Sequence, residues 1–141
     1  MRIFWDTNLF VYLWERSART SQVEALLNWQ REQHAELVTS TLTVGELLVH
    51  PLRLKREDLA DRYLASFSQM HVVAFDQPAA YAFAQLRAQY ARLAPPDAIQ
   101  LGCASVATVD LFVTNDRRLS RYPVPRVGEI RALADVEVRR R

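Results

Sequence analysis

Near its start the chain reads Arg2-Ile3-Phe4-Trp5-Asp6-Thr7-Asn8, a short apolar run that stops on a carboxylate. This pattern is typical of a buried strand that delivers an acid to its carboxyl end. Open α/β sheets place their ligand crevice at that edge. Asp6 also interrupts what would otherwise be one apolar run continuing into Leu9 and Phe10. We therefore expect Asp6 to belong to a functional site.

Three further acids have similar settings along the chain. Glu46 follows the strand-like run 36–40, Asp97 follows two prolines, and Asp116 follows the apolar run 111–115. Carboxylates that converge in one crevice repel one another unless a cation neutralises them, and Mg²⁺ and Mn²⁺ prefer oxygen ligands. If the four acids converge, the sequence predicts a divalent-metal site.

Each of these three acids also has a purely structural interpretation. Asp97 and Asp116 stand where helices begin, and a carboxylate there is stabilised by free backbone N–H groups and the helix dipole. Glu46 fits a capping box, Thr43-x-x-Glu46. Taken singly, each acid leaves both interpretations open.

Composition indicates a globular chain of one domain. The chain has 141 residues, of which 50% are hydrophobic and 24% charged, as in ordinary soluble domains and unlike disordered or membrane proteins. We expect a single domain over residues 1–141, with a compact core to about residue 130 and a C-terminal tail over 131–141. No signal peptide or membrane span is recognisable, and Cys103 is the single cysteine, so a cytoplasmic location is expected.

The basic residues are almost all arginine. The net charge is +2, and Lys55 is the single lysine. Arginine forms forked contacts with phosphate, so a nucleic-acid partner is compatible with this composition, although coding bias explains it equally well. The closing Arg139-Arg140-Arg141 fits either an RNA contact or a solvated tail.

Periodicity predicts strands that alternate with helices. Helix 78–93 carries Arg87 beside its apolar stripe, where the side chain either extends along the edge to water or reaches into the crevice. Helix 9–14 has Thr7 or Asn8 available as its cap, and helix 42–50 is expected to stop at Pro51. This alternation predicts a parallel sheet with helices on its faces. The remaining expected elements are strands 36–40, 71–75, 109–114 and 124–128, and helices 21–33, 57–67 and 96–107.

Several other chemistries are excluded by residue counts. Three glycines, at positions 45, 102 and 128, allow neither a dinucleotide fingerprint nor a P-loop. The three histidines are isolated from one another and from Cys103, so no zinc spacing exists.

The ordered motifs resemble those of the PIN-domain nucleases, and in size and order most closely those of the VapC toxins of toxin–antitoxin pairs. The resemblance spans Ile3 to about Gly128. Any one motif is weak, but four in the family's order are specific. The motifs are Asp6-Thr7-Asn8, Thr43-x-x-Glu46-Leu47, Pro95-Pro96-Asp97-Ala98-Ile99-Gln100-Leu101 and Phe112-Val113-Thr114-Asn115-Asp116-Arg117-Arg118-Leu119.

The resemblance implies a three-layer α/β/α fold around a parallel sheet of four to five strands, and a metal-dependent endoribonuclease. It carries over onto Asp6, Glu46, Asp97 and Asp116 as the acidic quartet. Asp6 and Asp97 would bind the metal directly, and the other two acids directly or through water. Thr7, Asn8 and Thr114 match polar positions around the metal. Arg87, Arg92 and Arg117 lie near the motifs and are candidate RNA phosphate contacts.

The resemblance also implies cofactors and partners. It implies one or two Mg²⁺ or Mn²⁺ ions that activate water to cleave RNA, a homodimer, and a small VapB-like antitoxin that covers the acidic crevice. Two alternatives stay open at this point: a PIN nuclease of RNA maturation, and a non-catalytic module of the same fold that binds RNA or protein.

Overall fold

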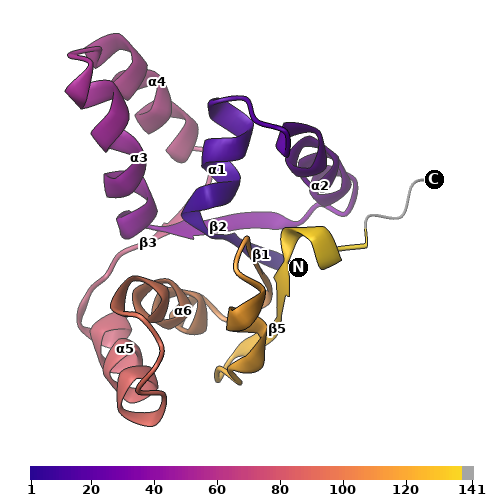
Figure 1. The fold of residues 1–141 in the computed structure, drawn as a ribbon, viewed down its shortest axis with the longest axis vertical. Helices are drawn as coiled ribbons and strands as arrows, with labels where there is room; N and C mark the ends of the chain where they lie inside the picture. The colour runs from indigo at the N-terminus through magenta and orange to yellow at the C-terminus, as the bar shows by residue number, and fades with distance from the viewer. Residues whose placement is uncertain (138–141) are drawn as a thin grey trace.

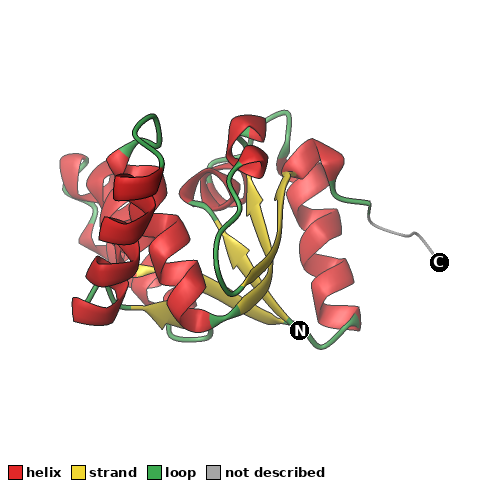
Figure 2. Cartoon of the chain, turned by 90° about the horizontal axis from the view of Figure 1, so that it is seen from below, coloured by secondary structure: helices red, strands yellow, loops and turns green. Residues whose placement is uncertain are grey.

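The computed structural model describes residues 1–137. The run Arg139–Arg141 therefore lies outside the described residues. Within residues 1–137, one five-stranded sheet has the order β3-β2-β1-β4-β5, and all neighbouring strands are parallel. Helices cover both faces of this sheet (Figures 1 and 2). The predicted three-layer α/β/α fold with a parallel sheet is confirmed. The strands are β1 Arg2–Trp5, β2 Glu36–Ser40, β3 His71–Val73, β4 Val109–Thr114 and β5 Val127–Ala132.

Helices divide between the two faces by their position in the chain. The first four lie above the sheet in Figure 1 and the last two below it. This division follows from the crossovers, because β1, β2 and β3 are joined by the first four helices and β3 returns to β4 through the last two. The helices are α1 Thr7–Trp14, α2 Thr20–Glu32, α3 Thr41–Arg53, α4 Glu57–Phe67, α5 Gln77–Gln89 and α6 Pro95–Ala107, with short 3-10 helices η1 Arg117–Arg121 and η2 Leu133–Asp135.

Strand β1 is buried on both faces, as a central parallel strand must be. Ile3 and Trp5 point into the core shared with α1 to α4, while Phe4 points into the core under α5 and α6. Phe4 stacks on Phe112 of β4 with ring centroids 4.9 Å apart. All three apolar residues of β1 are fully buried. The strand that leads to Asp6 is thus enclosed on both faces of the sheet.

Two sequence predictions about α3 are wrong: its end at Pro51 and its capping box. The helix continues through Pro51 to Arg53. Proline removes one backbone donor at a cost to the helix, and burial of the Pro51 ring offsets part of that cost. The predicted capping box is also absent, because the N-cap is Ser40, whose hydroxyl accepts from the Thr43 backbone N–H at 3.3 Å. Glu46 is therefore free of a capping role.

Other boundaries shift by a few residues. Asp6 caps α1, in place of Thr7 or Asn8, since its Oδ1 accepts from the Thr7 N–H. Helix α5 ends at Gln89 instead of residue 93. Strand β3 ends at Val73, and β5 covers 127–132 instead of 124–128. The chain packs past residue 130, because Leu133 is buried.

Candidate active site

Asp6 is held in place by three donors at the carboxyl edge of the sheet. Its Oδ1 accepts from the Thr7 N–H at 2.8 Å and from Gln100 Nε2 at 3.3 Å. Its Oδ2 accepts from Thr114 Oγ1 at 2.9 Å. Burial raises the pKa of Asp6, and the three hydrogen bonds oppose that shift. The carboxylate is thus fixed in orientation before any ligand arrives.

Gln100 connects the acids through a buried hydrogen-bond network. Its side chain is 2% exposed, and its Nε2 donates to Thr43 Oγ1 at 2.8 Å and to Thr7 Oγ1 at 3.2 Å. Its Oε1 accepts from the Ser40 hydroxyl. Thr7 Oγ1 in turn donates to Glu46 Oε1 at 2.9 Å. One amide therefore links α6, β2, α3 and the start of α1.

Asp97 occupies the first turn of α6, after the two prolines that open the helix. Burial raises its pKa, and the negative charges of Asp6, Asp116 and Glu46 add to this effect while Arg118 opposes it. The other three predicted acids thus lie close enough to Asp97 to add to the effect of burial on its pKa.

Asp116 differs from the other acids because it has a cationic partner. The Arg118 guanidinium donates to both carboxylate oxygens of Asp116, from Nε at 3.0 Å and from Nη2 at 2.8 Å. This contact lowers the pKa of Asp116. The Asp116 N–H also donates to Thr114 Oγ1 at 3.1 Å, which connects the backbone at Asp116 to Asp6.

The arrangement fits a hard divalent cation by its donors, although the side chains are not closed around one. Within residues 1–137, no three His, Cys, Asp or Glu side chains stand in a geometry that could hold a metal ion. Carboxylate and hydroxyl oxygens nevertheless meet at one edge, and the repulsion recorded at Asp97 is what a cation would relieve. An ion bound at Asp116 would compete with the Arg118 guanidinium for the same carboxylate.

The sequence of the chain matches the family model of the PIN domain over residues 3–125. The chain belongs to the PIN-domain family. This membership confirms the predicted family, and the match includes all four predicted acids. None of the curated proteins matches the chain.

Solved structures share the PIN-domain fold with this chain. A chain of VapBC2 from Rickettsia felis bound to a DNA fragment from the promoter aligns with a TM-score of 0.73 and 16% identity, covering 94% of this chain and 98% of that one. DNA-bound VapBC from Salmonella typhimurium gives 0.70 and 22%, covering 94% and 98%. FitAcB from Neisseria gonorrhoeae gives 0.66 and 25%, covering 81% and 87%. At these sequence identities, the structural similarity establishes the fold of this chain alone.

Of the three polar residues predicted around the metal, two contact the acids and one does not. Thr7 and Thr114 bind Asp6 or Glu46 directly, whereas Asn8 is exposed in the first turn of α1. Gln100, Ser40 and Thr43 are not among the predicted site residues, yet they form the buried network. A sequence signal for Gln100 exists, because it lies one helical turn after Asp97 as a polar residue within an apolar run.

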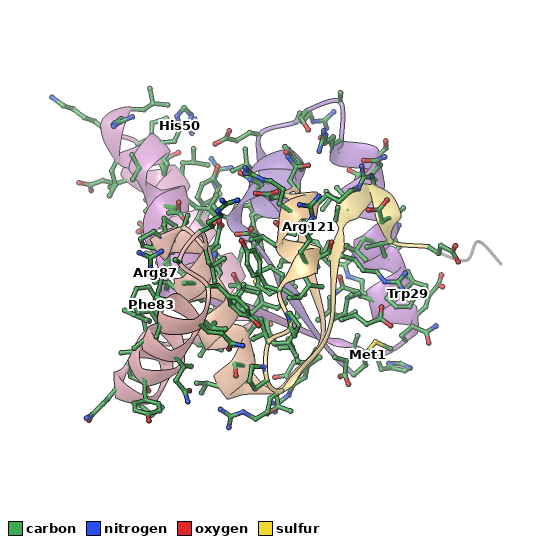
Figure 3. All side chains as sticks on the ribbon, turned by 60° about the horizontal axis from the view of Figure 1, so that its bottom comes forward. Met1, Trp29, His50, Phe83, Arg87 and Arg121 are labelled. Atoms are coloured by element: carbon green, nitrogen blue, oxygen red, sulfur yellow. The ribbon has the colours of Figure 1, made fainter. Side chains whose placement is uncertain are left out.

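The three predicted arginines also lie in different settings. Arg87, labelled on α5 in Figure 3, donates to the carbonyls of Ala91 and Leu93 and so holds the loop before α6. Arg117 pairs with Asp135 through two contacts of 2.8 and 2.9 Å. Arg92 lines a cavity of about 360 Å³ that borders Asp97 and Asp116.

A larger cavity of the PIN domain, of about 1020 Å³, lies away from the acids. Its lining comes from α1, α2, the end of α4 and the amino ends of the first three strands, and includes Trp5 and Gln30. Gln30 accepts from Trp5 Nε1 at 2.6 Å. The acids instead lie at the carboxyl ends of the strands, so cavity size does not locate the chemistry. No helix within residues 1–137 has both the length and the apolar character needed to cross a membrane.

Proposed function

We propose that this PIN-domain chain is a Mg²⁺- or Mn²⁺-dependent endoribonuclease and the toxin of a VapBC-type toxin–antitoxin pair. The observation that carries the proposal is the hydrogen-bond network at one sheet edge, in which Gln100 and Thr7 link Asp6 to Glu46, and Thr114 links Asp6 to the backbone of Asp116. Asp97 opens the same helix that carries Gln100. Helix capping alone, as by Asp6 at α1 and Asp116 at η1, does not require these contacts between segments. The acids are Asp6, Glu46, Asp97 and Asp116.

In this proposal the chain's residues have distinct roles. Asp6 and Asp97 bind the cation directly, and Glu46 and Asp116 bind it directly or through water. Thr7, Thr114 and Gln100 hold Asp6 and Glu46 in orientation through the contacts described above. When bound, one or two such cations lower the pKa of water and supply hydroxide for in-line attack on a phosphodiester.

The rim of the site supports a nucleic-acid substrate. The cavity beside Asp97 and Asp116 is lined by Arg92, Arg118 and Arg121; Arg121 ends η1 (Figure 3). Guanidinium groups attract and orient the phosphates of a single strand. Selection among RNA molecules then depends on the shape of an exposed loop or strand.

The toxin assignment rests on the structural neighbours and on available apolar surface. The neighbours include complexes called VapBC, FitAcB and FitAB, and a toxin–antitoxin complex from Klebsiella pneumoniae. In this chain the antitoxin covers the acidic crevice, and the toxin acts in the cytoplasm as a homodimer. A partner chain would cover four large apolar side chains exposed here. They are Val49 and Leu52 on α3, Leu54 directly after α3, and Leu64 on α4.

The first experiment is cleavage of total RNA by the purified chain with Mg²⁺ or Mn²⁺. Discrete fragments are expected with either ion and none with EDTA. Asp97→Asn should abolish cleavage, whereas Asp61→Asn, which removes an exposed carboxylate on α4, should not. Equal cleavage by wild type and Asp97→Asn would refute the assignment of the site.

A second measurement separates a nuclease from a binding module. Isothermal titration with Mn²⁺ should give a binding isotherm for wild type that is lost in Asp97→Asn. RNA binding without cleavage and without Asp97-dependent Mn²⁺ binding would favour a non-catalytic module.

A further inference from the structure

Arg118 is an exposed arginine in contact with a predicted metal ligand. Its side chain is 82% exposed, yet both Nε and Nη2 are committed to the carboxylate of Asp116. The carboxylate is 31% exposed. A forked contact of this kind occupies both oxygens of the acid at once.

The contact therefore competes with a cation bound directly to Asp116, because guanidinium and cation would share the two carboxylate oxygens. Asp116 Oδ1 already accepts from the Arg118 backbone N–H and from Nε, and Oδ2 accepts from Nη2. A divalent cation at Asp116 would meet the positive charge of Arg118 at the same oxygens. Exposed ion pairs contribute little to stability, so an arriving ion can displace this contact.

A displaced Arg118 side chain would still line a cavity next to Asp116 that suits a phosphate. The cavity of about 360 Å³ beside Asp116 is lined by Arg118 itself and by Arg92, Arg121 and Tyr122. Three arginines line one small cavity that Asp97 and Asp116 also border. Such a cavity suits an anion that binds next to a cation. A phosphate of an RNA strand has this chemistry.

We propose that Arg118 is a phosphate-binding residue that neutralises Asp116 in the metal-free protein and turns to the RNA phosphate when a divalent cation takes its place. The inference rests on the proposed nuclease function. It adds that Arg118 binds first Asp116 and then the RNA phosphate. Removing Arg118 should therefore affect cation binding and RNA cleavage in opposite directions.

The test compares wild type with Arg118→Gln and Arg56→Gln. Arg56 is a matched control, because its guanidinium also pairs with an acid two residues away, Asp58, at 2.9 Å, and it lies before α4. The Kd for Mn²⁺ is measured by titration calorimetry without RNA, and kcat/KM is measured on a mapped RNA fragment. Thermal unfolding of each variant verifies that the fold is intact.

Arg118→Gln should bind Mn²⁺ about three- to tenfold more tightly, since a competing cation has been removed. Its kcat/KM should fall about tenfold or more, because a forked phosphate contact is lost. Arg56→Gln should change neither quantity by more than about twofold, the usual range for an exposed ion pair.

Two results would overturn the inference while leaving the nuclease intact. Arg118→Gln could match Arg56→Gln in both measurements, or it could lose Mn²⁺ affinity together with activity, which would make Arg118 a support of Asp116. A wild-type chain that shows neither Asp97-dependent Mn²⁺ binding nor RNA cleavage would instead refute the proposed function, and the inference about Arg118 with it.

Discussion

Asp116 and Asp97, two residues at the acidic edge, differ in the charges around them, and this difference affects the stability of the protein. Asp116 is neutralised by Arg118, while Asp97 faces three like charges and has a raised pKa because of burial and those charges. Keeping Asp97 ionised therefore destabilises the metal-free protein. Under the proposed metal-dependent function, a bound cation would relieve this repulsion at Asp97.

Asp97→Asn should stabilise the metal-free protein by roughly 0.5 kcal/mol at pH 7, the scale of an exposed charge pair. A carboxylate whose pKa is raised in the folded state contributes stability below its unfolded pKa and loses it as pH rises through the folded pKa. The advantage of the variant should thus vanish in acid and appear as pH rises. Urea unfolding in EDTA across this pH range measures it.

Added Mn²⁺ should reverse that order of stability. Wild type is stabilised by a bound ion, and Asp97→Asn is not. Wild type that remains less stable than the variant at saturating Mn²⁺ would contradict a role for Asp97 in cation binding.

Gln100→Met should cost about 2 kcal/mol of unfolding free energy, because the substitution leaves buried partners of the amide unsatisfied. The volume is nearly kept, so a cavity contributes little. RNA cleavage should fall as well, since Asp6 and Glu46 lose their orientation. The control is Gln89→Met at the exposed end of α5, and an equal effect of the two substitutions would rule out the network.

The elements that carry the four predicted acids were predictable from the sequence, but the contacts of the acids were not. Asp6 and Asp116 follow apolar runs, and Asp97 follows a proline pair. These patterns mark strand ends and a helix start, whereas Glu46 lies inside α3. Arg117 and Arg118 are adjacent and chemically identical, yet one faces Asp135 and the other Asp116. The direction of each side chain depends on the turn between β4 and η1, which periodicity does not determine.

At the scale of elements, the position of α6 depends on a close approach to α5. A Cβ at Gly102 would lie 3.1 Å from the Ala79 carbonyl oxygen and 3.1 Å from the Phe83 nitrogen, both backbone atoms of α5. Glycine thus lets the two helices pack closely. Because α6 carries both Asp97 and Gln100, this packing also positions the site.

Two glycine-to-alanine substitutions should have opposite effects. A Cβ added at Gly45 in α3 would meet no atom within 4 Å, so Gly45→Ala should gain roughly 0.5–1 kcal/mol from helix propensity. Gly102→Ala gains the same propensity but must separate α5 from α6, and a net loss of about 1 kcal/mol is expected. Thermal unfolding of both variants gives the comparison, and a stabilised Gly102→Ala would mean that α5 moves aside at little cost.

The order of helices and strands was predictable, because the spacing of hydrophobic residues and the positions of prolines indicate the same elements along most of the chain. Pro51 shows where local rules fail, since α3 continues through it and buries its ring. The sequence predicts β5 too early because Val124 is apolar like a strand residue, although it is buried in the turn before the strand. Tertiary packing decides both cases.

At the scale of the whole molecule, a net charge of +2 gives little general attraction for RNA, so the local arginine cavity should dominate the salt dependence. Arg118 stays paired with Asp116 when no cation binds, so two phosphate contacts, from Arg92 and Arg121, predict a slope of about −1.4 for log affinity against log salt. RNA binding by the Asp97→Asn variant, measured between about 50 and 200 mM salt, should therefore weaken by roughly sevenfold. A flat dependence would place the RNA elsewhere on the chain.

Strand order has a further consequence for how the protein is made. Asp6 lies at the end of the first strand, but its partner Thr114 is 108 positions later, on β4, which pairs directly with β1. Asp6 therefore waits for its partner on β4, and the acidic edge is complete only once the chain has been synthesised beyond Asp116. Under the proposed nuclease function, a nascent chain shorter than this would have no activity against the ribosome that makes it.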